Sequence, residues 1–157
     1  MSLTVKITAP IFEKLSDLKE EYGFNELGLA VSGGSDSLAM LYICNDWAQK
    51  NKVKLHCLTV DHKLRSESAK EAELVANHCS GLGINHEIVE WKHEGNIGGN
   101  LSDLARSARY KLIDKWRKEL SFVLVGHTQN DQIETFFMNL KRGSGIEGLK
   151  GMPVSFK

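Results

Sequence analysis

One short segment of the sequence has residue types suited to phosphate binding: SGGSDS, residues 32–37. Its paired glycines allow a sharp turn and let the backbone approach a ligand without obstruction by a Cβ atom. If a helix begins directly after them, its unpaired amides and its dipole favour an anion, and the serines add hydroxyl donors. The simpler interpretation is a strand–turn–helix in which a Ser or Asp only caps the helix. The predicted phosphate-binding residues are Ser32, Gly33, Gly34, Ser35, Asp36 and Ser37.

The carboxylate in this segment predicts a metal ion. Asp36 would repel a phosphate beside it, so its presence makes sense if a divalent cation bridges it to the phosphate oxygens. Two other phosphate motifs are not supported. The sequence has no G-x-x-x-x-G followed by Lys and Ser or Thr, which disfavours a Walker-type nucleoside triphosphatase. A G-x-G-x-x-G at residues 143–148 follows a predicted helix instead of a strand, so we expect no dinucleotide site there.

A second group of reactive side chains comes late in the chain. On a helix, His127, Asp131 and Glu134 would project within a narrow arc. The two carboxylates could hold an ammonium group or orient an attacking amine, and the imidazole could hydrogen-bond a phosphate or an activated base. A second interpretation exists for Asp131, because Thr128 and Asp131 are spaced as a capping box that satisfies helix amides.

The spacing of apolar residues predicts the strands and helices that flank these two groups of polar residues. Strands and helices alternate, which predicts right-handed crossovers and a Rossmann-like α/β fold, with a mostly parallel sheet covered by helices on both faces. Ligands bind at the carboxyl ends of the strands in such sheets, and the polar groups follow those ends. We expect strands at 27–31, 53–60, 84–91 and 122–125, and helices at 11–22, 36–49, 66–82, 100–120 and 128–141.

Length and composition are those of one ordinary globular domain. The chain has 157 residues and a formal net charge of zero, which is mild evidence against a stand-alone nucleic-acid binder. The three cysteines are far apart, and we expect buried, reduced thiols instead of a metal or disulfide site. No apolar run approaches the ~20 residues needed to span a bilayer, and the first residues do not form a signal peptide. We therefore expect a cytoplasmic protein with no membrane partner.

The SGGSDS segment after the first predicted strand resembles the signature of the N-type ATP pyrophosphatases, the PP-loop superfamily. That superfamily includes NAD and GMP synthetases, asparagine synthetases and several tRNA-modifying enzymes. The resemblance implies an adenine nucleotide alpha-hydrolase-like fold, a loop that grips the pyrophosphate of ATP with Mg²⁺, and adenylation of a substrate oxygen.

Three further segments resemble the tRNA(Ile)-lysidine synthetase family. They are VDHKLR with ES at residues 60–68, AR and RY at 105–110, and the stretch from Gly126 to Leu149. The sequence departs from the family at two positions: Lys63 replaces the usual glycine, and Asn130 replaces an aspartate, so we assign no metal role to position 130. At the end of the second predicted strand, Asp61 and His62 are predicted to contact ATP, with His62 in the adenosine pocket; a structural role is the alternative for His62. Arg109 would face phosphates, although a solvated arginine on a helix surface is the alternative.

The reaction implied by this resemblance joins lysine to RNA. ATP would adenylate the 2-oxo group of the wobble cytidine in a tRNA(Ile) with a CAU anticodon, and free lysine would then displace AMP. Asp36, Arg109, His127, Asp131 and Glu134 would be the catalytic residues, with the two late carboxylates binding lysine. We expect residues 1–157 to be the N-terminal ATP-pyrophosphatase domain, with C-terminal RNA-binding domains beyond it. The alternatives are another PP-loop enzyme, either tRNA-thiolating or acting on a small molecule, and a non-catalytic module that senses ATP or AMP.

Overall fold

The computed structural model describes residues 3–63, 68–92 and 101–126. The chain divides into two compact units, 1–125 and 126–157, and every described helix and strand belongs to the first. In chain order they are α1 (Leu3–Tyr22), β1 (Glu26–Ala30), α2 (Ser35–Asn51), β2 (Lys54–Asp61), α3 (Ser68–Leu82), β3 (Asn85–Glu90), α4 (Leu101–Arg117) and β4 (Val123–Val125).

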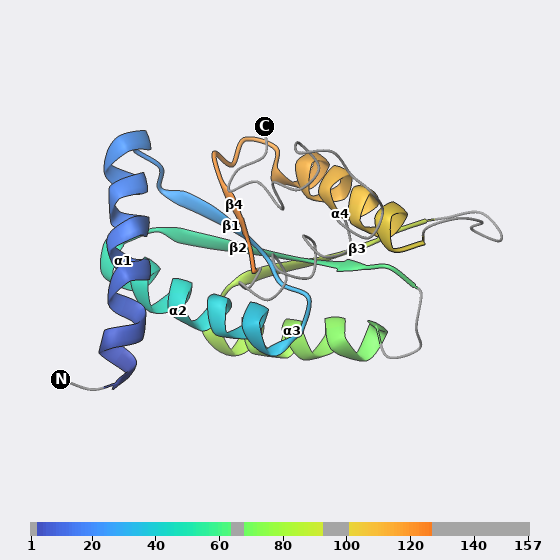
Figure 1. The fold of residues 1–157 in the computed structure, drawn as a ribbon, viewed down its shortest axis with the longest axis horizontal. Helices are drawn as coiled ribbons and strands as arrows, with labels where there is room; N and C mark the ends of the chain where they lie inside the picture. Colours follow the sequence, from blue (N-terminus) through green and yellow to red (C-terminus); the bar gives the residue numbers. More distant parts are fainter. Residues whose placement is uncertain (1–2, 64–67, 93–100, 127–157) are drawn as a thin grey trace, which may run out of the picture. The chain divides into compact units, whose positions relative to one another are not determined.

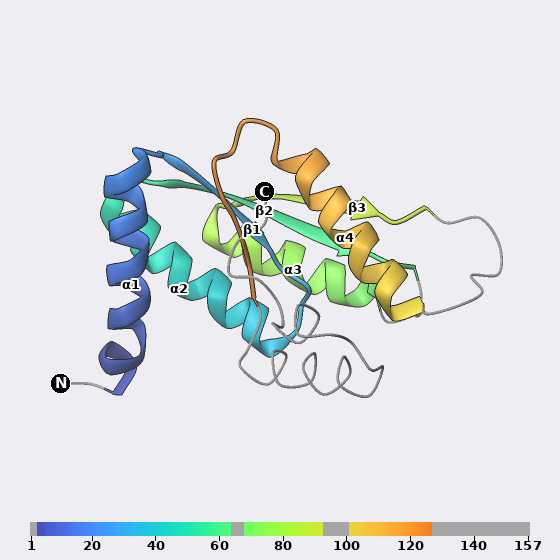
Figure 2. The same cartoon turned by 45° about the horizontal axis from the view of Figure 1, so that its top comes forward.

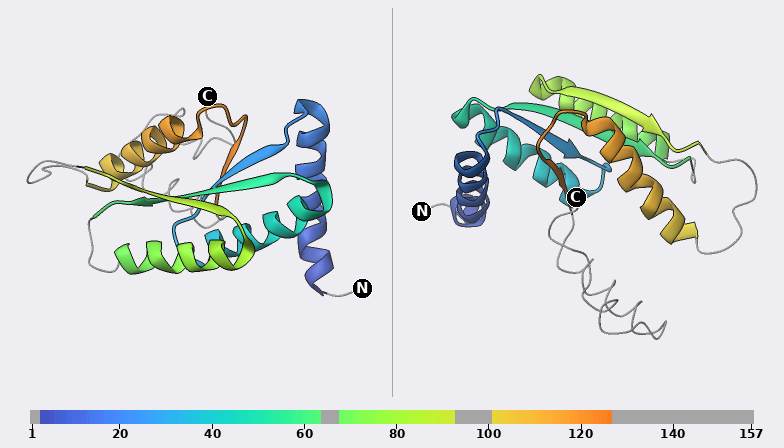
Figure 3. Two further views of the ribbon diagram at one scale, coloured as in Figure 1. Left: turned by 180° about the vertical axis from the view of Figure 1, so that it is seen from behind. Right: turned by 90° about the horizontal axis from the view of Figure 1, so that it is seen from above.

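The described strands form one parallel sheet in the order β3-β2-β1-β4. Helices α2 and α3 cover one face of this sheet and α4 covers the other (Figures 1 and 2). Figure 3 shows the same layers from behind and from above, with α1 beside the start of β1. The predicted α/β class, with parallel strands and helices on both faces, is confirmed.

The core lies between the sheet and α2 and α3. Leu29 from β1, Leu41 and Trp47 from α2, and Val75 from α3 are buried there, with at most 1% of each exposed. Burying one large apolar side chain stabilises a fold by about 1.5–3 kcal/mol. The indole of Trp47 also donates a hydrogen bond of 3.0 Å to the hydroxyl of Ser16, which ties α1 to α2. All three cysteines are buried and free, as predicted.

Gly28 allows the other layer to pack on the sheet. A Cβ atom at this position would lie 2.9 Å from a methyl of Val123, 3.1 Å from the Trp116 ring and 3.2 Å from a methyl of Leu120. Those distances leave no room for a side chain, so the end of α4 and the start of β4 can approach β1 only because residue 28 is glycine.

Two helix ends differ from the sequence prediction by three residues or more. Helix α1 begins at Leu3 instead of Ile11 and continues through Pro10, which has no amide hydrogen to donate within the helix. Helix α4 ends at Arg117, three residues early, because Lys118 adopts a left-handed conformation with φ 47° and the amide of Leu120 bonds the Arg117 carbonyl. The helix predicted at 128–141 lies outside the described residues. Among those described, no helix is long and apolar enough to cross a membrane.

Candidate functional site

The SGGSDS loop connects β1 to α2 at the carboxyl end of the sheet, as predicted. Gly34 is the N-cap of α2, and no side chain caps this end of the helix. The first hydrogen bond of helix α2 runs from the amide of Leu38 to the carbonyl of Gly34, at 3.0 Å. The first amides of a helix have no partner within it, so those of Ser35 and Asp36 are available to an anion.

Ser37 holds the loop closed. The residue is 4% exposed, and its hydroxyl donates to the Gly34 carbonyl at 2.9 Å. The same oxygen accepts from the Ser32 amide at 3.2 Å and lies 3.2 Å from the Ser32 hydroxyl. Because the hydroxyl proton of Ser37 is donated to the Gly34 carbonyl, this side chain stabilises the turn in this structure. A direct contact between Ser37 and phosphate stays a prediction.

The two glycines of the loop serve different purposes. Gly33 has a φ of +90°, and a Cβ there would lie 3.1 Å from the carbonyl oxygen of Glu71 in α3. Both the positive φ angle and the short distance to the Glu71 carbonyl therefore require glycine at position 33. Gly34 has a φ of −70°, and only the Ser32 hydroxyl lies within 4 Å of its added Cβ, at 3.8 Å. The protein itself does not require glycine at 34, so close approach of a ligand remains the predicted reason for it.

Thr59 supports the loop from β2, and sequence analysis missed it. Its buried hydroxyl donates to the Val31 carbonyl at 2.9 Å, directly before Ser32, and accepts from Nε2 of His86 at 2.9 Å. His86 therefore carries its proton on Nε2. Burial lowers the pKa of His86, while Glu87 raises it less strongly, so the imidazole is neutral near pH 7. The signal that could have identified Thr59 in the sequence is its hydroxyl, a polar group within a predicted buried apolar strand.

Asp61 ends β2, and its side chain bonds Lys63 and the first residue of α3. Its carboxylate, 4% exposed, accepts from the amide of Lys63 at 2.8 Å and from the hydroxyl of Ser68 at 2.7 Å. Burial alone would raise the pKa of Asp61, but these hydrogen bonds and the Lys63 ammonium, 3.7 Å away, outweigh it and lower the pKa. The structure thus gives Asp61 a structural role, and its predicted contact with ATP is not tested.

His62 and Arg109 meet next to Asp61, although 47 positions separate them in the chain. Nε of Arg109 donates to Nε2 of His62 at 3.4 Å, and the imidazole packs edge-to-face on Trp91 with centroids 5.8 Å apart. Burial and the charge of Arg109 lower the pKa of His62, against a smaller opposing effect of Asp61. Burial also lowers the pKa of Arg109, an effect that Tyr110 opposes and Arg106 reinforces.

The tautomer of His62 follows from this contact. Because Nε2 accepts from Arg109, the neutral ring carries its proton on Nδ1. This buried Nδ1 has no hydrogen-bond partner in the part of the chain that the structure describes. An unpaired buried donor costs about 1–3 kcal/mol, so a ligand acceptor at this position would be favoured.

The remaining predicted residues are divided between the exposed surface and the undescribed part of the chain. Asp36 is exposed, and its carboxylate lies 3.5 Å from the Ser35 hydroxyl. No set of three His, Cys, Asp or Glu side chains that could hold a metal occurs within the described ranges. A single carboxylate fits Mg²⁺, which usually takes one or two carboxylates together with substrate phosphates and water. His127, Asp131 and Glu134 lie outside the described residues.

Sequence comparison finds close relatives among enzymes that act on tRNA. The chain is 46% identical over 132 residues to the tRNA(Ile)-lysidine synthase of Wolbachia pipientis and 48% identical over 129 residues to that of Ruegeria pomeroyi. These alignments cover 82% and 80% of this chain but 30% of each relative. A synthase from Rickettsia bellii is 38% identical over 144 residues, with 90% of this chain and 33% of the relative covered. The chain thus spans about a third of the length of these relatives.

Solved structures share the fold at low sequence identity. The U34-tRNA thiolase NcsA of Methanococcus maripaludis superposes with a TM-score of 0.69 at 21% identity, covering 79% of this chain and 46% of the thiolase. The ammonia-dependent NAD synthetase of Campylobacter jejuni gives a TM-score of 0.60 at 16% identity, covering 96% and 77%. Residues 7–157 match the PP-loop domain, and the chain therefore belongs to the PP-loop domain family.

Proposed function

We propose that this chain is the ATP-using domain of a tRNA(Ile)-lysidine synthase. The observation that carries the proposal is the 46–48% identity to two such synthases over about four fifths of the chain. In the proposed reaction, the oxygen at position 2 of the wobble cytidine attacks the α-phosphorus of ATP and releases pyrophosphate. The amine of free lysine then attacks the adenylated carbon, AMP leaves, and the nitrogen loses its protons to give lysidine.

The residues of the SGGSDS loop would bind and orient the triphosphate. The free amides at the start of α2 and the hydroxyl of Ser35 donate to phosphate oxygens, while Gly34 leaves space for close approach. Asp36 would hold Mg²⁺, and the bound ion would neutralise charge on the departing pyrophosphate. Preorganised donors of this kind typically contribute a few kcal/mol to a rate enhancement.

The cluster at the end of β2 would complete the site. Arg109 supplies a fixed positive charge for a phosphate, and its contact with His62 leaves the Nδ1 proton of that histidine for the adenosine or the α-phosphate. The second carboxylate group, Asp131 and Glu134, is proposed to bind lysine, with His127 beside the activated base. Reduced, buried thiols support the predicted cytoplasmic compartment.

A tRNA-thiolating activity is the main alternative among PP-loop enzymes, because the thiolase NcsA shares the fold. Iron–sulfur clusters are held by cysteine thiolates. Cys44, Cys57 and Cys79 are all buried, and burial raises the pKa of Cys44 to about 12, which disfavours its thiolate. The cysteines of this chain therefore support the lysidine reaction over thiolation by a cluster bound to them. A non-catalytic ATP or AMP sensor is the other alternative.

Pyrophosphate release distinguishes these possibilities. The complete gene product is incubated with ATP, Mg²⁺, lysine and a tRNA bearing a CAU anticodon. The lysidine proposal requires release that depends on the tRNA and is absent when the wobble base is uridine. Release that is independent of RNA supports a small-molecule acceptor, and ATP binding without release supports a sensor.

A further inference from the structure

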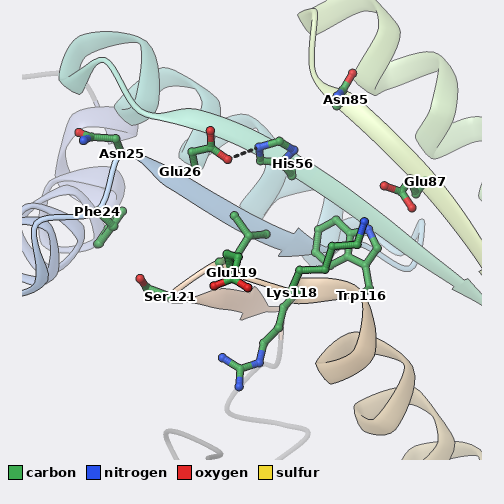
Figure 4. Close-up of a pocket in the computed structure, with 12 residues that line it drawn as sticks. Phe24, Asn25, Glu26, His56, Asn85, Glu87, Trp116, Lys118, Glu119 and Ser121 are labelled. Atoms are coloured by element: carbon green, nitrogen blue, oxygen red, sulfur yellow. Dashed lines mark hydrogen bonds and ion pairs between the residues drawn. The ribbon is translucent and has the colours of Figure 1, made fainter.

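A cavity lies at the amino end of the sheet, whereas the SGGSDS loop lies at the carboxyl end. Its volume is about 550 Å³, within the roughly 300–1,000 Å³ of small-molecule sites. Figure 4 shows residues from β1, β2 and β3 along one side of it, and Trp116 with the segment that follows α4 along the other. Nothing in the proposed lysidine reaction uses this cavity.

One wall of the cavity is a fixed aromatic ring. Trp116 lines the cavity and is half-buried, and its ring packs so closely on β1 that a Cβ on Gly28 would lie 3.1 Å from it. A ring held in this way loses little conformational freedom when a planar ligand stacks on it. Aromatic faces bind nucleobases by stacking, at about 1–3 kcal/mol per base.

The opposite wall presents hydrogen-bonding groups from neighbouring strands. The sheet register aligns Gly28 with His56 and His56 with Asn85, so these three positions form one row across the sheet. Nε2 of His56 donates to the carboxylate of Glu26 at 2.9 Å, which fixes the imidazole. Glu87 lies two positions beyond Asn85 on the same face of β3 and is exposed.

The cavity lining carries more acidic than basic side chains. Three glutamates line it, together with Arg117 at the end of α4 and Lys118 directly after the helix. Arg117 is already paired with Asp114 at 2.8 Å, and Asp114 does not line the cavity. Such a lining favours a ligand that donates hydrogen bonds, and the Trp116 ring beside it favours one that is planar. Carboxylates accept hydrogen bonds from the amino groups of bases, as Glu and Asp do with cytosine.

We propose that this cavity binds an unstacked nucleobase that carries both an amino group and a carbonyl group, cytosine or guanine. The base stacks on Trp116 and donates its amino hydrogens to Glu87, while the side-chain amide of Asn85 donates to the carbonyl oxygen, which adenine lacks. Either a free nucleoside or one position of a single-stranded RNA could present this chemistry. The site is separate from the SGGSDS loop and does not require the lysidine reaction to be correct.

The three tryptophans of the chain make the test specific. Trp116 reports on the cavity, Trp91 contacts His62 near the predicted ATP site, and Trp47 lies in the core. The indole N–H signals of the ¹⁵N-labelled 157-residue chain would be followed by NMR during titration with cytidine, guanosine and uridine. We expect cytidine or guanosine to shift the Trp116 signal alone, with uridine about tenfold weaker because it lacks the amino group. ATP with Mg²⁺ should shift Trp91 and leave Trp116 unchanged.

A surface variant separates binding from folding. Glu87→Gln lies at an exposed position of β3 and should weaken cytidine binding about tenfold while the Trp47 signal stays in place. Glu73→Gln, at an exposed position of α3, is the matched control and should change nothing. Hexacytidylate that binds at least about tenfold tighter than cytidine identifies RNA as the source, and equal affinity identifies the free nucleoside.

The proposal is overturned if no nucleoside moves the Trp116 signal, or if Glu87→Gln binds cytidine as well as the unaltered chain. A Trp116 shift that appears with an alkylammonium ion but not with nucleosides would also overturn it, in favour of a cation site.

Discussion

Thr59 lies in the second strand, yet its hydroxyl hydrogen-bonds the carbonyl of Val31, the residue directly before the SGGSDS loop, at 2.9 Å. The same hydroxyl accepts from His86 at 2.9 Å. One oxygen atom of β2 therefore bonds both β3 and the residue that follows β1. The position of the loop therefore depends on a side chain that does not belong to it.

Replacing this hydroxyl should destabilise the fold and displace the loop. Thr59→Val keeps the shape but leaves the Val31 carbonyl and the His86 N–H without a partner, which costs about 1–3 kcal/mol for each group that stays buried. Urea unfolding measures the loss, and ATP titration measures the accompanying drop in affinity. Thr59→Ser, which restores the hydroxyl, should recover most of both. Equal stability of the Val and Thr forms would contradict this role.

The two loop glycines should respond differently to alanine. Gly33→Ala introduces a Cβ 3.1 Å from the Glu71 carbonyl at a φ of +90°, so we expect a loss of about 1–3 kcal/mol in the free energy of unfolding. Gly34→Ala has room and an ordinary φ, so its stability should change by less than about 0.5 kcal/mol. Its ATP affinity should nevertheless fall if a phosphate approaches this backbone. Stability losses of the same size in both variants would contradict this assignment.

Acid should weaken the hydrogen bonds that Asp61 accepts from Lys63 and Ser68. Its pKa is lowered in the folded protein, so its stabilising contribution is present above the unfolded pKa, about 3.9, and is lost as pH falls through the folded value. The difference in unfolding free energy between the unaltered protein and Asp61→Asn should therefore be constant near neutral pH and shrink below about pH 4. A difference that grows on acidification would show that the pKa is raised instead.

Gly28→Ala should loosen the packing of α4 and β4 on β1. The added Cβ meets side-chain atoms of Val123, Trp116 and Leu120 at 2.9–3.2 Å, and overpacking of this kind typically costs about 1–3 kcal/mol. Gly81→Ala is the control, because nothing lies within 4 Å of its Cβ and it sits in α3. There alanine should stabilise the helix by up to about 1 kcal/mol. Thermal unfolding of the two variants should shift in opposite directions.

Sequence patterns predicted the elements well because apolar runs and helical spacing are local properties. The β1–loop–α2 unit was expected from its glycines and serines and is present. Two relationships could not be anticipated, because they join residues far apart in the chain: the support of Val31 by Thr59 and the meeting of His62 with Arg109. The premature end of α4 was missed because Lys118 adopts a left-handed conformation that its residue type does not favour.

The most direct test of the proposed function measures transfer of lysine to RNA. The complete gene product is incubated with ATP, Mg²⁺, radiolabelled lysine and a tRNA bearing a CAU anticodon, and label on the RNA is counted. We predict label that requires ATP, falls to background with Asp36→Ala, and persists with Asp46→Ala, an exposed aspartate of α2 outside the loop. No label on the RNA, together with AMP formed on another acceptor, would keep the ATP chemistry and contradict the lysidine assignment.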